Sequence, residues 1–251
     1  MSPARRSRLS ERVALVTGAG RGIGRATALA LAEAGADVVV LDRDRASAAD
    51  AAQEIGAATG RRALAVQADV ADAAQVRRAV RRTVEGLGRL DILVNNAGIW
   101  AHGRLGEVRE ADWDRVLAVN VKGVLVCTQA VLPQMRAQKA GKIVTVASAA
   151  GLRPAPEWTA YCISKAAAVM LSRVAAAQLK PEGIQVHCLC PGAVRTDLVR
   201  RITRLTGDRF PHAMDPALVA DAVVSLLTPF RSRRTGRVVG LYAGVSTEVA
   251  V

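Results

Sequence analysis

Residues 13–35 read VALVTGAGRGIGRATALALAEAG, in which an apolar run, a glycine-rich turn and a segment of helical period follow one another directly. The run Val13–Val16 predicts a buried strand, and the spacing of apolar residues over Ile23–Ala34 predicts a helix that ends at Gly35. Glycines let the backbone of such a turn approach a pyrophosphate, and the positive end of the following helix attracts the same group. We therefore interpret this turn as a dinucleotide-binding turn rather than a merely structural one.

Short apolar runs and longer helical segments alternate along most of the chain. We expect further strands at Asp37–Leu41, Ala63–Gln67, Ile92–Val94, Lys142–Val146 and Gln185–Leu189, and further helices at Arg45–Ala58, Ala73–Leu87, Ala111–Ala137 and Tyr161–Leu179. Strands that are apolar throughout are buried on both faces, so they lie parallel with helices above and below. The sequence predicts an α/β fold, a Rossmann-type doubly wound parallel sheet of about seven strands, whose ligands bind beyond the carboxyl ends of the strands.

The length of 251 residues fits one large domain. No linker or shift of composition marks a second unit, so we expect a single dinucleotide-binding domain over residues 11–251. A flexible basic tail is expected over residues 1–10. The least regular stretch, about residues 197–216, is the best candidate for a lid.

The net charge of +13 would by itself suggest a nucleic acid or an anionic membrane as partner. The arginines are spread along the chain, however, and no basic tract alternates with stacking aromatic residues. We interpret the charge as a solvated surface and expect neither nucleic-acid nor membrane binding. No apolar run reaches the length of a membrane span, and no secretory signal is recognisable at the N-terminus.

Four cysteines follow no paired framework, which favours reduced thiols in a cytoplasmic protein. Cys188 and Cys190 lie two apart in an apolar run without a second pair of metal ligands. We expect them to be buried small side chains, and we expect no metal site.

Asp42 lies at the end of the second predicted strand, 18 residues after Gly24. A carboxylate at this point can accept hydrogen bonds from the hydroxyls of an adenosine ribose, and it repels a 2′-phosphate. Arg21 and Arg43 act in the opposite direction, because either could reach such a phosphate. Placing a phosphate dianion beside a carboxylate is costly, so the sequence favours NAD over NADP, with NADP left open. The alternative for Asp42 is a helix cap before Arg45.

Two further segments follow predicted strands. Asp69-Val70 comes after the third strand, where a side chain could contact the adenine amino group, and an N-cap for the next helix is an equally good interpretation of Asp69. Asn95 is assigned a structural role between strands. The small residues after it let the chain pass close to a ribose. The cofactor-binding residues expected up to this point are Gly18, Arg21, Gly22, Ile23, Gly24, Asp42, Arg43, Asp69, Val70, Asn96, Ala97 and Gly98.

Tyr161 and Lys165 lie four residues apart at the start of an apolar helix, so they project from the same side. A free tyrosine has a pKa near 10, and a neighbouring ammonium together with an oxidised nicotinamide can lower that pKa toward neutrality. Ser148 follows the fifth predicted strand and can bind a substrate oxygen beside the phenol. Asn120 lies within the long preceding helix. This pattern predicts proton transfer to or from a substrate oxygen.

With these residues in place, the chain resembles the short-chain dehydrogenase/reductase family, in its branch of single-domain enzymes of this length. The resemblance runs in order from about residue 11 to residue 197. It is carried by Thr17–Gly24, Asp69, Asn95–Gly98, Asn120, Ser148, Tyr161 with Lys165, and Pro191-Gly192 with Thr196.

The resemblance implies a role for each catalytic position. Tyr161 would be the general acid or base, and Ser148 would orient the carbonyl. Lys165 would bind the nicotinamide ribose and lower the pKa of the tyrosine. Asn120 would hold a water that links Lys165 to solvent. The residues expected to contact the nicotinamide, besides Tyr161 and Lys165, are Pro191, Gly192, Val194 and Thr196.

Two features depart from the family pattern. The usual glycine-rich carboxyl terminus, with an aspartate before paired glycines, is replaced by the stretch Thr235–Gly244. That region commonly packs between subunits in the tetramers that the family often forms. Its replacement counts against a tetramer, so the expected homo-oligomer is left as a tetramer or a dimer. The segment after Thr196 is also rich in arginine and could face an acidic substrate or carrier, although ordinary surface charge is the favoured interpretation.

The leading hypothesis is an NAD-dependent oxidoreductase that acts on a small-molecule secondary alcohol or ketone. One alternative is an NADP-dependent ketoreductase with a 3-oxoacyl or polyketide-type substrate. A more remote alternative is a non-catalytic dinucleotide sensor. The expected pocket walls, besides the lid, are Ile99, Trp100, His102, Leu152, Pro154, Glu157 and Trp158.

Overall fold

The computed structural model describes residues 9–228, 230 and 234–249. Its strands form one sheet of eight in the order β3-β2-β1-β4-β5-β6-β7-β8. Every pairing from β3 to β7 is parallel, and β8 is antiparallel to β7. The strands are β1 Val13–Thr17, β2 Asp37–Asp42, β3 Ala63–Gln67, β4 Ile92–Asn95, β5 Gly141–Val146, β6 Ile184–Pro191, β7 Val238–Tyr242 and β8 Val245–Glu248.

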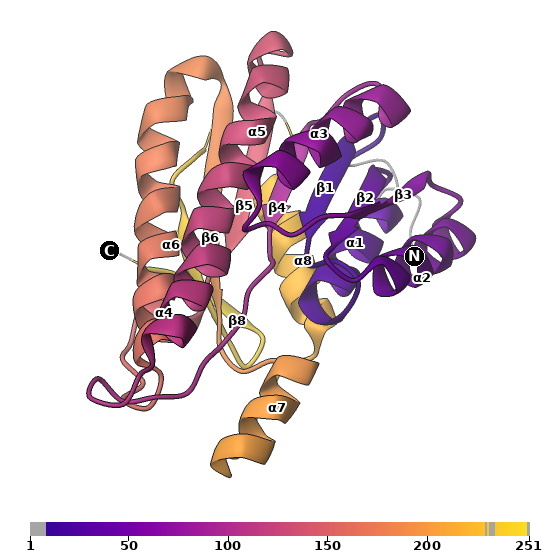
Figure 1. The fold of residues 1–251 in the computed structure, drawn as a ribbon. Helices are drawn as coiled ribbons and strands as arrows, with labels where there is room; N and C mark the ends of the chain where they lie inside the picture. The colour runs from indigo at the N-terminus through magenta and orange to yellow at the C-terminus, as the bar shows by residue number, and fades with distance from the viewer. Residues whose placement is uncertain (1–8, 229, 231–233, 250–251) are drawn as a thin grey trace.

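Helices cover both faces of the sheet (Figure 1). The core on one face includes side chains of α1, α2 and α8, and the core on the other includes side chains of α3, α5 and α6. The predicted Rossmann-type doubly wound fold is therefore confirmed. The helices are α1 Gly22–Glu33, α2 Arg45–Thr59, α3 Ala73–Leu87, α4 Glu110–Leu117, α5 Gly123–Ala137, α6 Thr159–Leu179, α7 Asp197–Thr206 and α8 Pro216–Leu227.

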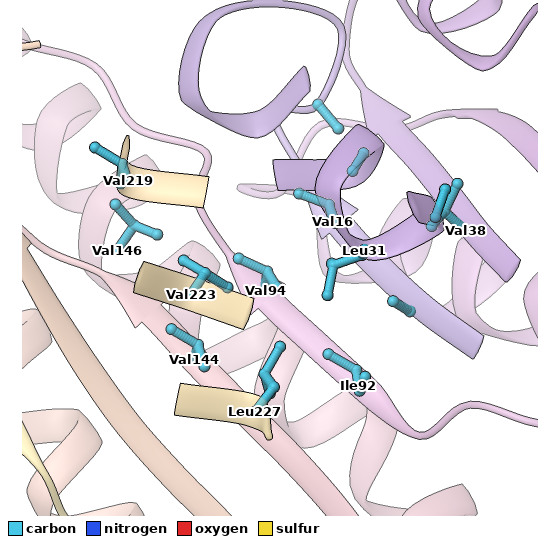
Figure 2. Close-up of a cluster of buried hydrophobic side chains, with 14 of the residues drawn as sticks. Val16, Leu31, Val38, Ile92, Val94, Val144, Val146, Val219, Val223 and Leu227 are labelled. Atoms are coloured by element: carbon cyan, nitrogen blue, oxygen red, sulfur yellow. The ribbon is translucent and has the colours of Figure 1, made fainter. Parts of the chain in front are cut away.

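The strands are held in place by branched aliphatic side chains. Figure 2 shows Val223 and Leu227 of α8 lying over Val94 and Val144 of the two central strands, and all four are essentially inaccessible to solvent. Each such side chain stabilises the fold by about 1.5–3 kcal/mol on burial. This packing fixes the carboxyl ends of β1, β4 and β5 relative to one another, which is what a site built at that edge requires.

The segment predicted as one helix over Ala111–Ala137 has three parts. Between α4 and α5, Ala118–Lys122 forms a π-helical turn, and the backbone runs on without a break. A π turn inserts an extra residue into the helix, so side chains before and after it change direction. Asn120 lies in this turn.

The chain after β6 contains elements that the apolar pattern did not predict. These are α7, α8, β7 and β8. The estimate of about seven strands missed β8, whose four residues are all exposed. The turn between β7 and β8 consists of Ala243 and Gly244, both with positive φ, as a two-residue hairpin turn requires.

The amino-terminal tail was predicted to extend to residue 10, and this boundary is wrong. Leu9 is fully buried, and its backbone N–H donates to the carbonyl of Ala34 at 2.9 Å. Its apolar side chain fills the core beneath α1 and so anchors the chain. Residues 1–8 of the predicted tail lie outside the described residues.

Two helical stretches, Glu110–Ala137 and Thr159–Glu182, are long and apolar enough to cross a membrane by length and composition alone. Helices that pack on a central sheet pass the same test, so this is weak evidence for a membrane. Both stretches lie on one face of the sheet (Figure 1). Their outer sides carry exposed Leu125, Ile163, Met170 and Val174.

Candidate active site

A cleft of about 400 Å³ follows the carboxyl ends of the strands. Its walls come from the segments after β1 to β6, together with α6 and α7. β1 lies between β2 and β4 in the sheet, so the winding reverses beside it, and open α/β sheets bind ligands at such a point.

The glycine-rich turn lies against the segment after β4. A Cβ on Gly18 would be 2.9 Å from Ala97 Cα, and a Cβ on Gly24 would be 2.2 Å from the Gly18 carbonyl oxygen. The side-chain amide of Asn96 donates to the carbonyls of Thr17 and Gly18 at 2.9 and 3.1 Å. These contacts hold the turn open at the start of α1, where the backbone fits a dinucleotide pyrophosphate.

Asp42 closes the other side of this turn. One carboxylate oxygen accepts the N–H of Gly20 at 3.0 Å, and the other accepts the N–H of Asp44 at 3.1 Å. The cap of α2 is Asp44, which accepts two helix N–H groups, so Asp42 is not the cap. Arg21 and Arg43 line the same end of the cleft and are exposed.

Asp69 is not the cap of the following helix, and Asn95 joins a strand to a helix rather than two strands. Asp69 lines the cleft and accepts the N–H of Ala71 at 2.9 Å, while the cap of α3 is Asp72. Asn95 is buried, and its amide donates to Thr128 Oγ1 at 3.3 Å, which ties β4 to α5.

Tyr161 and Lys165 project into the cleft from the first two turns of α6. The Lys165 ammonium donates to the carbonyl of Val146 at 3.1 Å and lies 5.7 Å from the centroid of the Tyr161 ring. Both side chains are buried. The end of β5 thus fixes the lysine, which in turn lies close to the phenol.

Ser148 is held by the turn that follows β5. Its hydroxyl accepts the N–H of Ala150 at 3.2 Å, and it forms a hydrogen bond with the Tyr161 phenol. The turn lies directly on α6, because a Cβ on Gly151 would be only 2.7 Å from the backbone carbon of Lys165. Gly151 therefore lets the serine approach the tyrosine, a role that the sequence did not reveal.

Burial dominates the ionisation of the pair. It raises the pKa of Tyr161 to about 12, and the hydrogen bond with Ser148 offsets only part of this effect. Burial also lowers the pKa of Lys165 to about 8. The expected lowering of the tyrosine pKa by the lysine is not seen in the protein alone, because removing both groups from water disfavours their charged forms.

Asn120 does not line the cleft. Its side chain accepts the N–H of Ile99 at 2.9 Å and donates to the carbonyl of Ile99 and to Ser164 Oγ, both at 2.9 Å. A Cβ on Gly98 would lie 3.3 Å from Lys165 Nζ and 3.4 Å from Asn120 Oδ1. A side chain at position 98 would therefore crowd both groups, and glycine leaves the space beside them free.

Most of the predicted site residues meet at the cleft. The cofactor-binding residues predicted from sequence that line it are Gly18, Arg21, Gly22, Ile23, Asp42, Arg43, Asp69, Val70, Asn96, Ala97, Gly98, Tyr161, Lys165, Pro191, Gly192, Val194 and Thr196. Gly24 does not line it and instead packs beneath the turn.

Among the expected pocket walls, Ile99 and Trp158 line the cleft. The remaining ones, which do not, are Trp100, His102, Leu152, Pro154 and Glu157. The segment expected as a lid also forms a wall, and the lining residues in it that the sequence did not single out include Leu198, Val199, Ile202 and Phe210. The helical spacing of the first three was a signal that could have revealed them.

A model of the short chain dehydrogenase family matches residues 12–206. The chain belongs to the short-chain dehydrogenase/reductase family. Oxidoreductase UcpA of Salmonella typhimurium is 41% identical over 208 residues, which cover 82% of this chain and 78% of that protein. The 3-oxoacyl-[acyl-carrier-protein] reductase of a Synechocystis strain is 41% identical over 194 residues, covering 77% of this chain and 78% of that protein.

The crystal structure of levodione reductase superposes with a TM-score of 0.89 at 30% identity, covering 94% of this chain and 98% of that chain. As a short-chain dehydrogenase/reductase, the protein is an oxidoreductase that binds a nicotinamide nucleotide and acts on CH–OH groups of small molecules.

Proposed function

We propose that this short-chain dehydrogenase/reductase moves a hydride between NAD(H) and the carbon of a secondary alcohol or ketone, with Tyr161 as the general acid or base. The observation that carries the proposal is the group of three side chains at the floor of the cleft. The buried phenol of Tyr161 forms a hydrogen bond with Ser148, and Lys165 lies beside the Tyr161 ring. The bound nicotinamide would supply the hydride in reduction and accept it in oxidation.

In the reductive direction, Ser148 and Tyr161 both place a hydroxyl where a carbonyl oxygen can be received. The Ser148 hydroxyl accepts the Ala150 N–H, so its own proton can be donated, to the Tyr161 oxygen in the protein alone and to the substrate oxygen once substrate is bound. With a pKa of about 12, Tyr161 is protonated at neutral pH and can give its proton to that oxygen as the carbon gains the hydride. The products are a C–H bond, an O–H bond and the tyrosinate.

Lys165 stabilises the tyrosinate through its positive charge. Its pKa of about 8 keeps the ammonium mostly protonated at pH 7. In this proposal the proton lost by Tyr161 is returned through Lys165 and a water bound between it and Asn120, beside Gly98, whose lack of a side chain leaves the space next to both groups free. In this proposal Asn120 orients the Ile99 segment and the end of that path.

The preference for NAD rests on Asp42. Its carboxylate lies at the adenosine end of the cleft and is fixed by two backbone N–H groups. Such a fixed negative charge binds ribose hydroxyls and repels a 2′-phosphate. A second candidate is an NADP-dependent ketoreductase, which Arg21 and Arg43 favour and which a relative named 3-oxoacyl-[acyl-carrier-protein] reductase supports.

The test is a screen of ketones and secondary alcohols, followed by nicotinamide absorbance with NADH and NADPH in parallel. The proposal expects turnover, with kcat/KM higher for NADH. A clear advantage of NADPH would favour the second candidate. If both cofactors bind and no carbonyl or alcohol reacts, the enzymatic proposal is wrong, and the result favours the alternative of a non-catalytic dinucleotide sensor.

We also propose a homo-oligomer, in which a second copy covers the apolar side of α5 and α6. Ile163, Met170 and Val174 form a stripe along α6, and Leu125 lies on α5 of the same layer. Each is more than two fifths exposed, and Met170 is 52% exposed. Light scattering on the wild type and on Met170→Glu tests this assembly, because the charge should shift the mass toward the monomer.

A further inference from the structure

The cleft has a charged end and an apolar end. Arg21, Asp42, Arg43 and Asp69 line it after β1, β2 and β3, and the Lys165 ammonium is held by the end of β5. The apolar end lies beyond Ser148 and Tyr161. Its walls come from the turn after β5, the residue before α6 and the segment predicted as a lid. The described residues that line it include Ala149, Ala150, Trp158, Leu198, Val199, Ile202 and Phe210.

The only charged group among the described lining residues at the apolar end is Asp197, at the start of α7. Its carboxylate is paired with Arg200. A carboxylate or phosphate on a substrate would meet no cation there, and an unpaired charge in a partly buried site is strongly disfavoured. The apolar end therefore selects against anionic substrates.

Trp158 lies at the centre of an aromatic group at this end. Its ring centroid is 6.1 Å from that of Tyr161 and 6.0 Å from that of Trp100, and both pairs meet edge to face. A third contact, 6.3 Å between centroids, joins it to Phe210 beyond α7. The indole is thus fixed from three sides, three residues before the phenol, and offers a rigid flat surface beside it.

The lid helix α7 presents its apolar side to the cleft. Successive residues of a helix turn by about 100°, so Leu198, Val199 and Ile202 share one side. Ile202 is buried in the same cluster as Trp158 and Phe210, whereas Arg201 and Arg204 are exposed. In Figure 1, α7 stands out from the end of the molecule. Its arginines are exposed. The arginines are surface charge and do not line the cleft.

We propose that the substrate is an uncharged ketone with a ring near the carbonyl, or the corresponding secondary alcohol. The ring packs on Trp158, and α7 with Phe210 covers it. Trp158 and Phe210 are then the residues that determine specificity. This inference rests on the proposed hydride transfer and adds to it the class of substrate.

Three ketones that share the same reacting group, a methyl ketone, test the proposal: butan-2-one, 4-phenylbutan-2-one and 4-(3-oxobutyl)benzoate. We expect kcat/KM for the phenyl ketone to exceed that for butan-2-one by about tenfold or more, because the ring buries apolar surface. The benzoate differs from the phenyl ketone by one carboxylate, and we expect its kcat/KM to be lower by about tenfold or more. A benzoate that reacts as well as the phenyl ketone would overturn the proposal.

Variants of Trp158 and Phe210 test whether these two residues determine the specificity. Trp158→Ala and Phe210→Ala should each raise KM for the phenyl ketone about tenfold and change KM for butan-2-one much less. Trp158→Phe, which keeps an aromatic ring, should recover most of the loss. Arg204→Ala, on the outer side of α7, is the matched control and should change neither value. Equal losses for both ketones in the alanine variants would contradict a specificity role.

A binding measurement answers the same question without turnover. The Tyr161→Phe variant loaded with NADH is titrated with the phenyl ketone and with the benzoate by calorimetry. Tighter binding of the phenyl ketone supports the substrate class even if no reaction is found, whereas tighter binding of the benzoate refutes it. Absence of turnover in the wild type, with the binding preference intact, would refute the proposed reaction alone.

Discussion

Replacing Asp42 by asparagine tests the basis of cofactor choice. The change removes the charge and keeps an oxygen that can accept the Gly20 N–H, which lies 3.0 Å from the carboxylate. At about 4 Å, two unit charges near a protein surface repel by about 4 kcal/mol before screening by salt. We expect about 1.5 kcal/mol of this to act on a 2′-phosphate in the half-buried site, so kcat/KM for NADPH should rise about tenfold.

The same change weakens the binding of NADH. Hydrogen bonds to a charged acceptor contribute about 1.5–3 kcal/mol, and those to a neutral acceptor about 0.5–1.5 kcal/mol. The midpoints of these ranges differ by about 1.3 kcal/mol, which predicts an approximately tenfold fall in kcat/KM for NADH. The ratio of NADH to NADPH efficiency should therefore shift about 100-fold in Asp42→Asn, the product of the two changes.

The assay is steady-state reduction of one ketone with each cofactor at fixed ionic strength. Asp44→Asn is the matched control. It also removes one negative charge, only two residues from Asp42, but the carboxylate it removes is the one that caps α2. An unchanged ratio in Asp42→Asn, or an equal shift in Asp44→Asn, would refute the assignment of selectivity to Asp42.

Three further predictions follow from glycine packing and from the burial of two basic side chains, His187 and Lys165. Gly24→Ala should raise the Kd for NADH about tenfold in a fluorescence titration, because its Cβ would lie 2.2 Å from the Gly18 carbonyl oxygen. Gly56→Ala, whose Cβ has space, should leave the Kd unchanged. Equal effects of the two changes would contradict the role of the glycine-rich turn in binding the dinucleotide. Burial lowers the pKa of His187 to about 4, so the unfolded chain binds more protons between pH 4 and 6.5 and acidification through this window should cost up to about 3 kcal/mol of stability. Urea unfolding of His187→Leu should show a smaller loss over the same window, and an identical slope would contradict the claim. The pKa of Lys165, about 8, predicts that kcat/KM for ketone reduction falls as pH rises above that value, because the ammonium is lost; a profile that stays flat to pH 10 would show that its charge is not needed.

The strands and the dinucleotide turn could be predicted because their physical causes are local. A strand buried on both faces is apolar throughout, as Val13–Val16 is, and a tight turn beside Ala97 tolerates only glycine at position 18. The topological rule then placed the site after the strands. Residues as distant in sequence as Asp42 and Tyr161 were therefore expected in one cleft, and both line it.

Features that depend on three-dimensional packing could not be predicted. The π turn around Asn120 follows no apolar period, and the bonds of Asn120 to Ile99 depend on how α4 meets the chain after β4. The sequence placed Lys165 beside Tyr161 but could not show that both are buried, and burial reverses the expected pKa shift of the phenol. In the segment predicted as a lid, the arginines were more conspicuous than the apolar spacing that includes Ile202.

The protonating role of Tyr161 is tested most directly by Tyr161→Phe, which removes only the phenolic oxygen from a buried ring. The measurement is single-turnover oxidation of NADH by a saturating ketone, with the Kd for NADH determined on the same preparation. We predict that hydride transfer slows by about 100-fold or more while the Kd for NADH stays within about threefold of the wild type. Hydride transfer at the wild-type rate in this variant would contradict the central claim.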